Sequence, residues 1–281
     1  MLNKNEIFLS DNKIAFGKFP KSIVYDSILI NKLNNLDSVN DIVYLDGEKY
    51  LKITNGSVEE VIESNFITTS GDVIKKKDII KTVSVNNNMY FKFEPIIWKI
   101  LKTNGCCYTL ITEDVIYSLA YKYITDDNRY FYNNYEESTI RNYLNNNFYN
   151  EVFSEDEKRC IIKTLVINQV ETTKYTSNPY VCANTFDYIY IPSYRDINNP
   201  EYKFNDDKDR TCNATAYAIE LGAKISFDDI YHGNAIYYLR SPDGYYDNKV
   251  SMVNCFGSAN DIIDVTREDG GIRPMMNIVI K

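Results

Sequence analysis

The cysteines and the single histidine are the residues with which this chain could hold a soft metal or carry out thiol chemistry. The six cysteines form no C-x-x-C pair; they are Cys106, Cys107, Cys160, Cys182, Cys212 and Cys255. A structural zinc site usually gathers four ligands at short spacings, which this pattern does not predict. Cys255 with Cys212 or Cys182 could bind copper(I), which accepts thiolates. We mainly expect buried free thiols.

The residue pattern does not favour nucleophilic catalysis with a histidine base or a phosphate-binding loop. His232, the only histidine, lies in a polar loop, and no G-x-S-x-G nucleophile elbow is present. Neither G-x-G-x-x-G nor a Walker pattern occurs, so a glycine-rich phosphate loop is not predicted. The sequence therefore favours a protein without catalytic residues, and no cofactor is predicted.

Calcium is the one cofactor left open by the acidic loops. Ca²⁺ prefers several carboxylate and carbonyl oxygens from one loop. The segments 205–209 and 243–248 are richest in such groups, but neither follows the EF-hand spacing or the Glu-Pro-Asn motif of sugar-binding lectins. We expect solvated acidic loops there.

A tyrosine- and asparagine-rich group near the C-terminal end is the best candidate binding surface. Tyrosine offers a large amphipathic contact area at low entropic cost, and Asn and Asp supply adaptable hydrogen bonds. The candidate residues are Tyr231, Asn234, Tyr245, Tyr246, Asp247 and Asn248, with Asn254 and Asn260.

Arg240 and Arg273 complete the candidate ligand-binding residues. A guanidinium group can clamp the carboxylate of a ligand or of the protein itself. The alternative is a structural salt bridge that organises the C-terminal loops, with Glu94 and Arg141 as internal counterparts.

Charge and hydropathy restrict the partners. The chain has 281 residues, a formal net charge of -8 and 44% hydrophobic residues, enough for a substantial core. Its one basic run, 75–77, lies between Asp72 and Asp78, so neither nucleic acid nor an anionic membrane is a predicted partner. No segment approaches the ~20 apolar residues of a membrane span. Without a visible signal peptide we expect a cytoplasmic location, with a surface or phage-associated location left open.

The elements that must position these residues divide the chain into an N-terminal region, 1–88, and a domain, 89–281. In the first we predict a strand over 14–20 ended by Pro20, a helix over 26–36, and a hairpin joined by Asp46-Gly47. The polar segment 55–88, with a turn at Gly71, is expected to be a loop or boundary.

The second region reads as strands with flanking helices. We expect a strand over 90–101 interrupted at Pro95, followed by a turn at Asn104-Gly105 into 107–111. Ser138 should cap a helix that buries Ile140, Leu144 and Phe148, and a capping box at Ser154 should open a second helix that buries Ile161 and Ile162. A third helix should start at Thr211 or Asn213 and end at Gly222. Further strands are expected over 188–191, 235–240, 250–256, 262–265 and 276–280.

Several of these segments, in this order, resemble a bacterial family known only as domain of unknown function 6273. They are Phe16–Pro20, Phe93–Leu101, Glu137–Asn145 running into 148–150, Phe153-Ser154, Tyr237–Pro242 and Gly271–Pro274. The last two also resemble C-type-lectin-like folds, which include the formylglycine-generating enzymes. Here Tyr237-Tyr238 stands where the family usually has a tryptophan-rich stretch.

The resemblance implies an α+β fold, mainly antiparallel sheet with flanking helices and a C-type-lectin-like C-terminal core. With it we expect a non-catalytic recognition module that binds a glycan or a protein. The alternatives are a thiol- or copper-dependent oxidase related to the formylglycine-generating enzymes, and a structural or phage-particle subunit.

Overall fold

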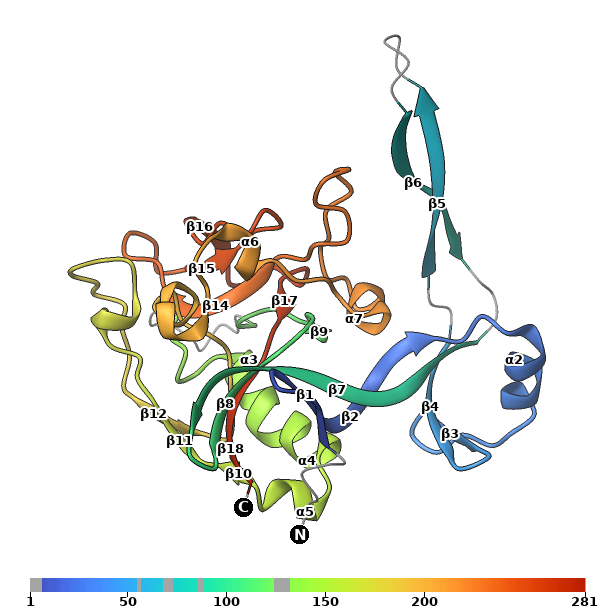
Figure 1. Ribbon diagram of the computed structural model, residues 1–281, viewed down its shortest axis with the longest axis horizontal. Coiled ribbons are helices and arrows are strands. Elements are labelled where there is room, and N and C mark those ends of the chain that lie inside the picture. The colour runs from blue at the N-terminus through green and yellow to red at the C-terminus, as the bar shows by residue number, and fades with distance from the viewer. Residues whose placement is uncertain (1–6, 55–56, 68–72, 85–87, 124–131, 281) are drawn as a thin grey trace.

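A computed structural model describes residues 7–54, 57–67, 73–84, 88–123 and 132–280. Within 57–67 and 73–84 it describes the backbone pairing alone. The fold is α+β and mainly antiparallel, as the sequence predicts, with two larger sheets and short helices (Figure 1).

The larger sheet has nine strands and runs across most of the molecule. Its main path is β1 (Phe8–Ser10), β2 (Lys13–Ile23), β7 (Met89–Asn104), β8 (Cys107–Thr112), β18 (Met275–Val279) and β10 (Ile161–Ile162). Beside this path, β13 (Ile189–Tyr190) pairs with β18, and the hairpin of β3 (Ile42–Leu45) and β4 (Glu48–Ile53) pairs with β7. All of these pairs are antiparallel.

Two prolines that we expected to end or interrupt strands lie inside them. The strand β2 continues past Pro20 to Ile23, and β7 runs unbroken through Pro95. Pro20 pairs with Phe93, and the β2–β7 register shifts between Ala15 and Lys18 and again after Pro20. Proline lacks an N–H and is tolerated in a sheet at such irregularities, so the predicted strand end at Pro20 and the predicted interruption at Pro95 are both wrong.

The second sheet carries the C-terminal strands. Its order is β16 (Asp261–Asp264), β15 (Lys249–Val253), β14 (Tyr237–Pro242), β17 (Gly271–Ile272) and β9 (Tyr117–Ser118). The β14–β17 pair is parallel, and the other pairs are antiparallel. The predicted strands are confirmed with ends displaced by up to three residues. A separate two-stranded ribbon joins β11 (Thr164–Val166) to β12 (Thr185–Asp187).

The helix predicted after Ser138 is confirmed. The Ser138 hydroxyl accepts the Arg141 N–H at 3.1 Å, and α3 (Thr139–Tyr143) continues through a π-helical turn, Leu144–Phe148, into α4 (Tyr149–Val152). Ile140, Leu144 and Phe148 are fully buried in the main core.

The second and third helices differ from the prediction. The capping box at Ser154 is present, but α5 (Glu155–Lys158) is one turn long, and Ile161 and Ile162 instead form β10 against β18. The third helix, α7 (Ala216–Glu220), is capped by Thr215 rather than by Thr211 or Asn213. A short α6 (Asp207–Arg210) and 3₁₀ turns at Val170–Thr172, Asp196–Asn198 and Pro200–Tyr202 complete the helical segments described.

In the N-terminal region, α2 (Ser27–Asn34) begins after the Asp26 cap as predicted. The predicted hairpin turn is present, with φ of 51° at Asp46 and 82° at Gly47, the positive angles that a tight turn requires. The expected loop at 55–88 is wrong: β5 (Ser57–Ile67) and β6 (Val73–Ser84) form a long antiparallel hairpin that extends away from the rest of the chain (Figure 1). Gly71 lies outside the described residues.

The main core joins residues from both predicted regions. Phe16 of β2 packs on Phe153 with ring centroids 5.6 Å apart, and its carbonyl accepts the Trp98 indole N–H at 2.8 Å. A second, smaller core contains Leu33, Val43, Tyr50 and Tyr90. The division at residue 88 stays a prediction, and the nine-stranded sheet continues across it.

Candidate functional site

The loop between β14 and β15 presents the most exposed aromatic pair of the predicted surface. Tyr245 is 77% exposed and Tyr246 is 53% exposed. Both follow Asp243, which is buried and comes directly after β14. A buried carboxylate next to two exposed rings can fix the loop that carries them, by accepting hydrogen bonds from its backbone.

Hydrogen bonds hold this loop in one conformation. One oxygen of the Asp243 carboxylate accepts the backbone N–H groups of Tyr245, at 2.9 Å, and Tyr246, at 3.1 Å, and the other accepts the Tyr175 hydroxyl. The Asn133 amide donates to the carbonyls of Tyr246 and Lys249, both at 2.9 Å. Because the loop is ordered before any ligand arrives, binding costs less conformational entropy.

The tyrosine loop borders a groove of about 450 Å³, which we call the tyrosine groove. Its lining residues are Lys174, Tyr175, Asp243, Tyr245, Tyr246, Met252, Asn260, Asp261 and Ile262. The rings of Tyr175 and Tyr245 meet edge to face, with centroids 5.5 Å apart. The groove thus combines aromatic faces with carboxylate, amide and ammonium groups.

The Tyr175 hydroxyl stays protonated at neutral pH. Burial, and then the hydrogen bond to Asp243, raise the pKa of Tyr175 to about 12. The groove therefore contains a neutral phenol beside a carboxylate, and Tyr175 can hold Asp243 in place as a donor.

The predicted surface residues do not all meet at this groove. Tyr245, Tyr246 and Asn260 line it. Asp247 and Asn248 belong to the same loop: the Asp247 carbonyl accepts the Asn133 N–H at 2.9 Å, and the Asn248 amide donates to Asp264 at 3.0 Å.

The remaining predicted residues lie outside the groove lining. The Tyr231 ring packs on Phe256 at 4.8 Å, and the Asn234 amide donates to the Cys255 carbonyl at 3.0 Å. The Asn254 amide donates to Asp261 at 2.5 Å, next to the groove. Sequence reasoning missed Lys174 and Tyr175, which come from a loop about seventy positions earlier in the chain.

Arg273 has an internal role. Its side chain is 0% exposed, and its guanidinium donates to the carbonyls of Thr112 and Arg210, both at 3.0 Å, while stacking on the Tyr237 ring. A ligand at the surface does not reach this group. Arg273 therefore leaves the candidate site and acts as a buried cross-link between segments.

Arg240 is also buried, but it lines a second, polar pocket of about 360 Å³. It forms an ion pair with Asp196 at 2.6 Å. The predicted counterparts are wrong, because Glu94 accepts a hydrogen bond from Ser22 and Arg141 pairs with Asp187. The spacing of these residues along the sequence does not predict which of them pair.

The cysteines are all free thiols, but the expected burial holds for Cys212 alone, since Cys106 is exposed and the other four are partly exposed. The carbonyls of Cys212 and Cys255 bond to the adjacent residues Ala235 and Asn234, so these two cysteines lie in neighbouring segments. Cys182 lies instead beside Glu136. Burial raises the pKa of the Cys212 and Cys182 thiols, which disfavours the thiolate that metal binding or nucleophilic attack requires.

The acidic segment 205–209 uses its carboxylates internally. Asp206 accepts the Asp209 N–H at 3.0 Å, Asp209 accepts the Asn205 N–H at 2.9 Å, and Asp207 pairs with Arg210 at 2.6 Å. Across the described ranges, no three His, Cys, Asp or Glu side chains gather as a metal site would require. His232 contacts the Phe227 ring at 6.2 Å between centroids.

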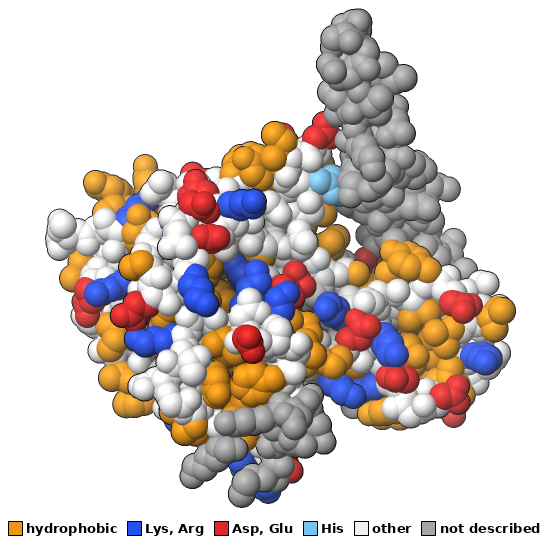
Figure 2. Space-filling view, in the orientation of Figure 1, with side chains coloured by type: hydrophobic (Ala, Val, Ile, Leu, Met, Phe, Trp, Pro, Cys, Tyr) orange, Lys and Arg blue, Asp and Glu red, His pale blue; other side chains and the backbone are white. Residues whose placement is uncertain are grey.

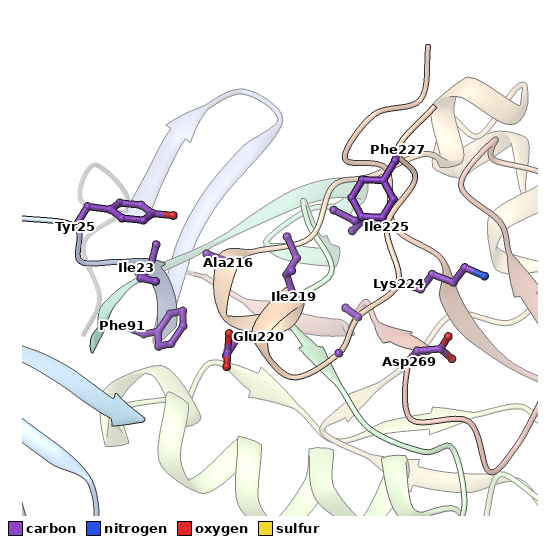
Figure 3. Close-up of a pocket in the computed structure, with 12 residues that line it drawn as sticks. Ile23, Tyr25, Phe91, Ala216, Ile219, Glu220, Lys224, Ile225, Phe227 and Asp269 are labelled. Atoms are coloured by element: carbon purple, nitrogen blue, oxygen red, sulfur yellow. The ribbon is translucent and has the colours of Figure 1, made fainter. Parts of the chain in front are cut away.

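An apolar groove of about 460 Å³ lies beside α7 (Figure 3). Ile23, Tyr25 and Phe91 face Ile219 and Phe227 across it, with Glu220, Lys224 and Asp269 among the charged residues of its lining. None of the residues selected from the sequence lines this groove. On the face shown in Figure 2, acidic and basic side chains are interspersed with hydrophobic ones.

Comparison with known proteins identifies the family. A family model described as Domain of unknown function (DUF6273) matches residues 108–280. Comparison with curated proteins and with solved structures gave no match. No helix in the described part of the chain is long and apolar enough to span a membrane.

The matched segment begins at β8 and ends after β18. It contains the tyrosine groove, the polar pocket and Arg273, whereas the resembling segments 16–20 and 93–101 precede it. Because the family model covers more than half of the chain, this protein belongs to the family defined by the domain of unknown function DUF6273.

Proposed function

We propose that this protein is a non-catalytic recognition module that binds a glycan in the tyrosine groove. The observation that carries the proposal is the exposure of Tyr245 and Tyr246 on a loop held by the buried Asp243. An exposed tyrosine ring offers an apolar face to the C–H face of a sugar, and its hydroxyl offers a hydrogen bond. Asn260 and Asp261 supply polar groups beside the rings.

The C-type-lectin-like character of the C-terminal core is part of this proposal. Its support is the Leu-Arg-Ser-Pro segment in β14, followed by β15, β16 and the Gly-Ile-Arg-Pro segment before β18. A protein ligand is the alternative occupant of the same groove, since tyrosine-rich loops serve protein recognition equally well.

The test is binding of the purified chain to a broad glycan array, with calcium and again with a chelator. We expect selective hits that persist in the chelator and that disappear in Tyr246→Ala. Tyr44→Ala is a matched control, because Tyr44 is a similarly exposed tyrosine (66%) in β3. Loss on chelation would instead indicate calcium at the acidic segments 205–209 or 243–248.

A blank array under both conditions would reject the glycan proposal and favour a protein ligand. The same Tyr246→Ala and Tyr44→Ala pair then distinguishes groove-dependent protein capture from unspecific capture. Protein capture that is unchanged in Tyr246→Ala would favour the structural or phage-particle subunit.

The thiol- or copper-dependent oxidase is the alternative from another class. The neighbouring positions of Cys212 and Cys255 favour it, and the burial of Cys212 disfavours it. Copper binding by the reduced protein that is abolished in Cys255→Ser would support the oxidase. Equal metal content in Cys255→Ser and the unmodified chain would refute it.

A further inference from the structure

The polar pocket that contains Arg240 has a composition different from that of the tyrosine groove. It lies between strands β8, β11 and β18 on one side and the 3₁₀ turns at 196–202 on the other. Its volume of about 360 Å³ falls in the range of ~300–1,000 Å³ that small-molecule sites occupy. A buried ion pair, two tyrosines and an amide line it.

Asp196 offers one hydrogen-bond acceptor that the fold does not use. Its Oδ2 atom accepts the N–H and the hydroxyl of Ser193, both at 2.8 Å, and the Arg240 Nη1 at 2.6 Å. Oδ1 receives no hydrogen bond from the part of the chain that the structure describes. The Asp196 side chain is 20% exposed, so a ligand can reach it.

Arg240 offers hydrogen-bond donors beside this acceptor. Its Nη1 is committed to Asp196 and to the Ile191 carbonyl, at 2.8 Å. Its Nε and Nη2 reach only the Ile167 carbonyl, and both distances are 3.4 Å, which is long for a hydrogen bond. A hydroxyl group in the pocket would give these donors a better acceptor.

The charges of the pocket balance. Arg240 neutralises Asp196 inside, and the exposed side chains of Arg195 and Glu171 carry opposite charges among the lining residues. A phosphate or a carboxylate would meet no net positive charge here. A neutral ligand whose hydroxyls both donate and accept hydrogen bonds fits this pocket better than an anion, because no charged group of the ligand has to lose its water.

Tyr190 and Tyr202 supply the apolar surface. Tyr190 is buried beneath the Arg240 guanidinium, whose central carbon lies 5.7 Å from the ring centroid. The Tyr190 hydroxyl accepts the Asn277 amide at 3.3 Å. Tyr202 lines the same pocket and is half-buried, so its ring can pack on the C–H face of a small ring ligand.

We propose that this pocket binds one neutral sugar residue, with adjacent hydroxyls on Asp196 and Arg240 and the sugar ring against Tyr202. This site is separate from the tyrosine groove and does not depend on it. Among the residues selected from the sequence, it gives Arg240 a ligand contact in addition to its internal ion pair.

The experiment is ligand-observed NMR and titration with neutral monosaccharides (glucose, galactose and mannose) and, as charged probes, glucuronate and glucosamine. We expect at least one neutral sugar to bind with a dissociation constant of about 1 mM or lower. Each charged probe should bind more weakly than the best neutral sugar. Tyr202→Ala should weaken binding about tenfold, the upper range for one aromatic contact.

Two further variants separate this site from the groove and from loss of folding. Tyr245→Ala should leave monosaccharide binding unchanged, and Tyr202→Ala should leave hits on the glycan array that depend on Tyr246 unchanged. Asp196→Asn should weaken monosaccharide binding more than Tyr202→Ala does, because the new amide N–H₂ replaces the free Oδ1 acceptor with a donor. Fluorescence of the buried Trp98 reports whether each variant is folded.

Three results would overturn the proposal. They are no binding of any neutral sugar by the unmodified chain, equal or tighter binding of the charged probes, and binding that is lost in Tyr245→Ala but retained in folded Tyr202→Ala. The last result would assign the sugar to the tyrosine groove instead.

Discussion

Replacing Asp243 by alanine is the sharpest test of how the tyrosine loop is held. The change removes a buried carboxylate that accepts two backbone N–H groups and the Tyr175 hydroxyl. Hydrogen bonds to a charged group contribute ~1.5–3 kcal/mol each, net of the bonds to water that replace them on unfolding. Tyr245 and Tyr246 are exposed, so water can satisfy their N–H groups in the variant, and we take a lower value of about 1 kcal/mol for each of the three bonds.

The expected loss of stability is therefore about 3 kcal/mol. With a urea dependence of about 3 kcal/mol per molar, the unfolding midpoint should fall by about 1 M. Affinity for a groove ligand should fall as well, since two backbone units are no longer fixed before binding. At ~1 kcal/mol each, this entropy corresponds to a loss of about thirtyfold.

Urea unfolding followed by fluorescence is the assay, because the chain has a single tryptophan and Trp98 is buried in the main core. Asp247→Ala is the matched control: Asp247 is exposed in the same loop, and its backbone carbonyl makes the bond to Asn133. If Asp243→Ala behaves like Asp247→Ala in both stability and affinity, Asp243 does not hold the loop.

Three other predictions concern the frame around the site. Gly257→Ala should lower the free energy of unfolding by more than about 3 kcal/mol, because φ is +88° and the added Cβ would lie 1.7 Å from the Asp207 carbonyl oxygen. Gly105→Ala is the control and should cost only about 1 kcal/mol, because φ is +60° but the space around the added Cβ is open. Equal urea midpoints of the two variants would refute this. Arg273→Met should destabilise by about 3 kcal/mol, since at least two buried carbonyls lose their donor, and a thermal midpoint within 2 °C of the unmodified chain would contradict the assignment. Stability should fall as pH rises from 10 to 12, because the unfolded chain releases the Tyr175 proton near 10.0 and the folded chain near about 12. The contribution of Tyr175 to stability is therefore fully present below pH 10. In urea titrations, Tyr175→Phe should lose less stability over this pH window than the unmodified chain.

Local signals in the sequence predicted local structure well. The Asp46-Gly47 turn, the Ser138 cap and the Ser154 capping box each act over a few residues, and each is present. Their chemistry is complete within one turn of the chain. For this reason a single sequence is enough to find them.

The errors have two sources, a missing sequence pattern and partners that are distant in the chain. The strands β5 and β6 form a local hairpin, but they lack the alternation of apolar residues that marks a strand. Ile161 and Ile162 read as a continuation of a helix, but they pair with β18 more than a hundred residues later.

The candidate site was predictable only in part, because several of its contacts also join segments that are distant in the chain. Tyr245 and Tyr246 were found because they are adjacent in one loop. Their partner Tyr175, and the pairing of Arg240 with Asp196, depend on segments brought together by the fold. Spacing along the chain carries no record of such contacts.

The position of β18 bears on how the protein folds during synthesis. This strand is the last of the large sheet in sequence, yet it lies inside the sheet, between β8 and β10. Until residues 275–279 leave the ribosome, β8 has an open edge on one side and β10 and β13 lack their partner. The nascent chain therefore exposes unpaired strand edges for most of its synthesis, and its large sheet is completed only after β18 has emerged.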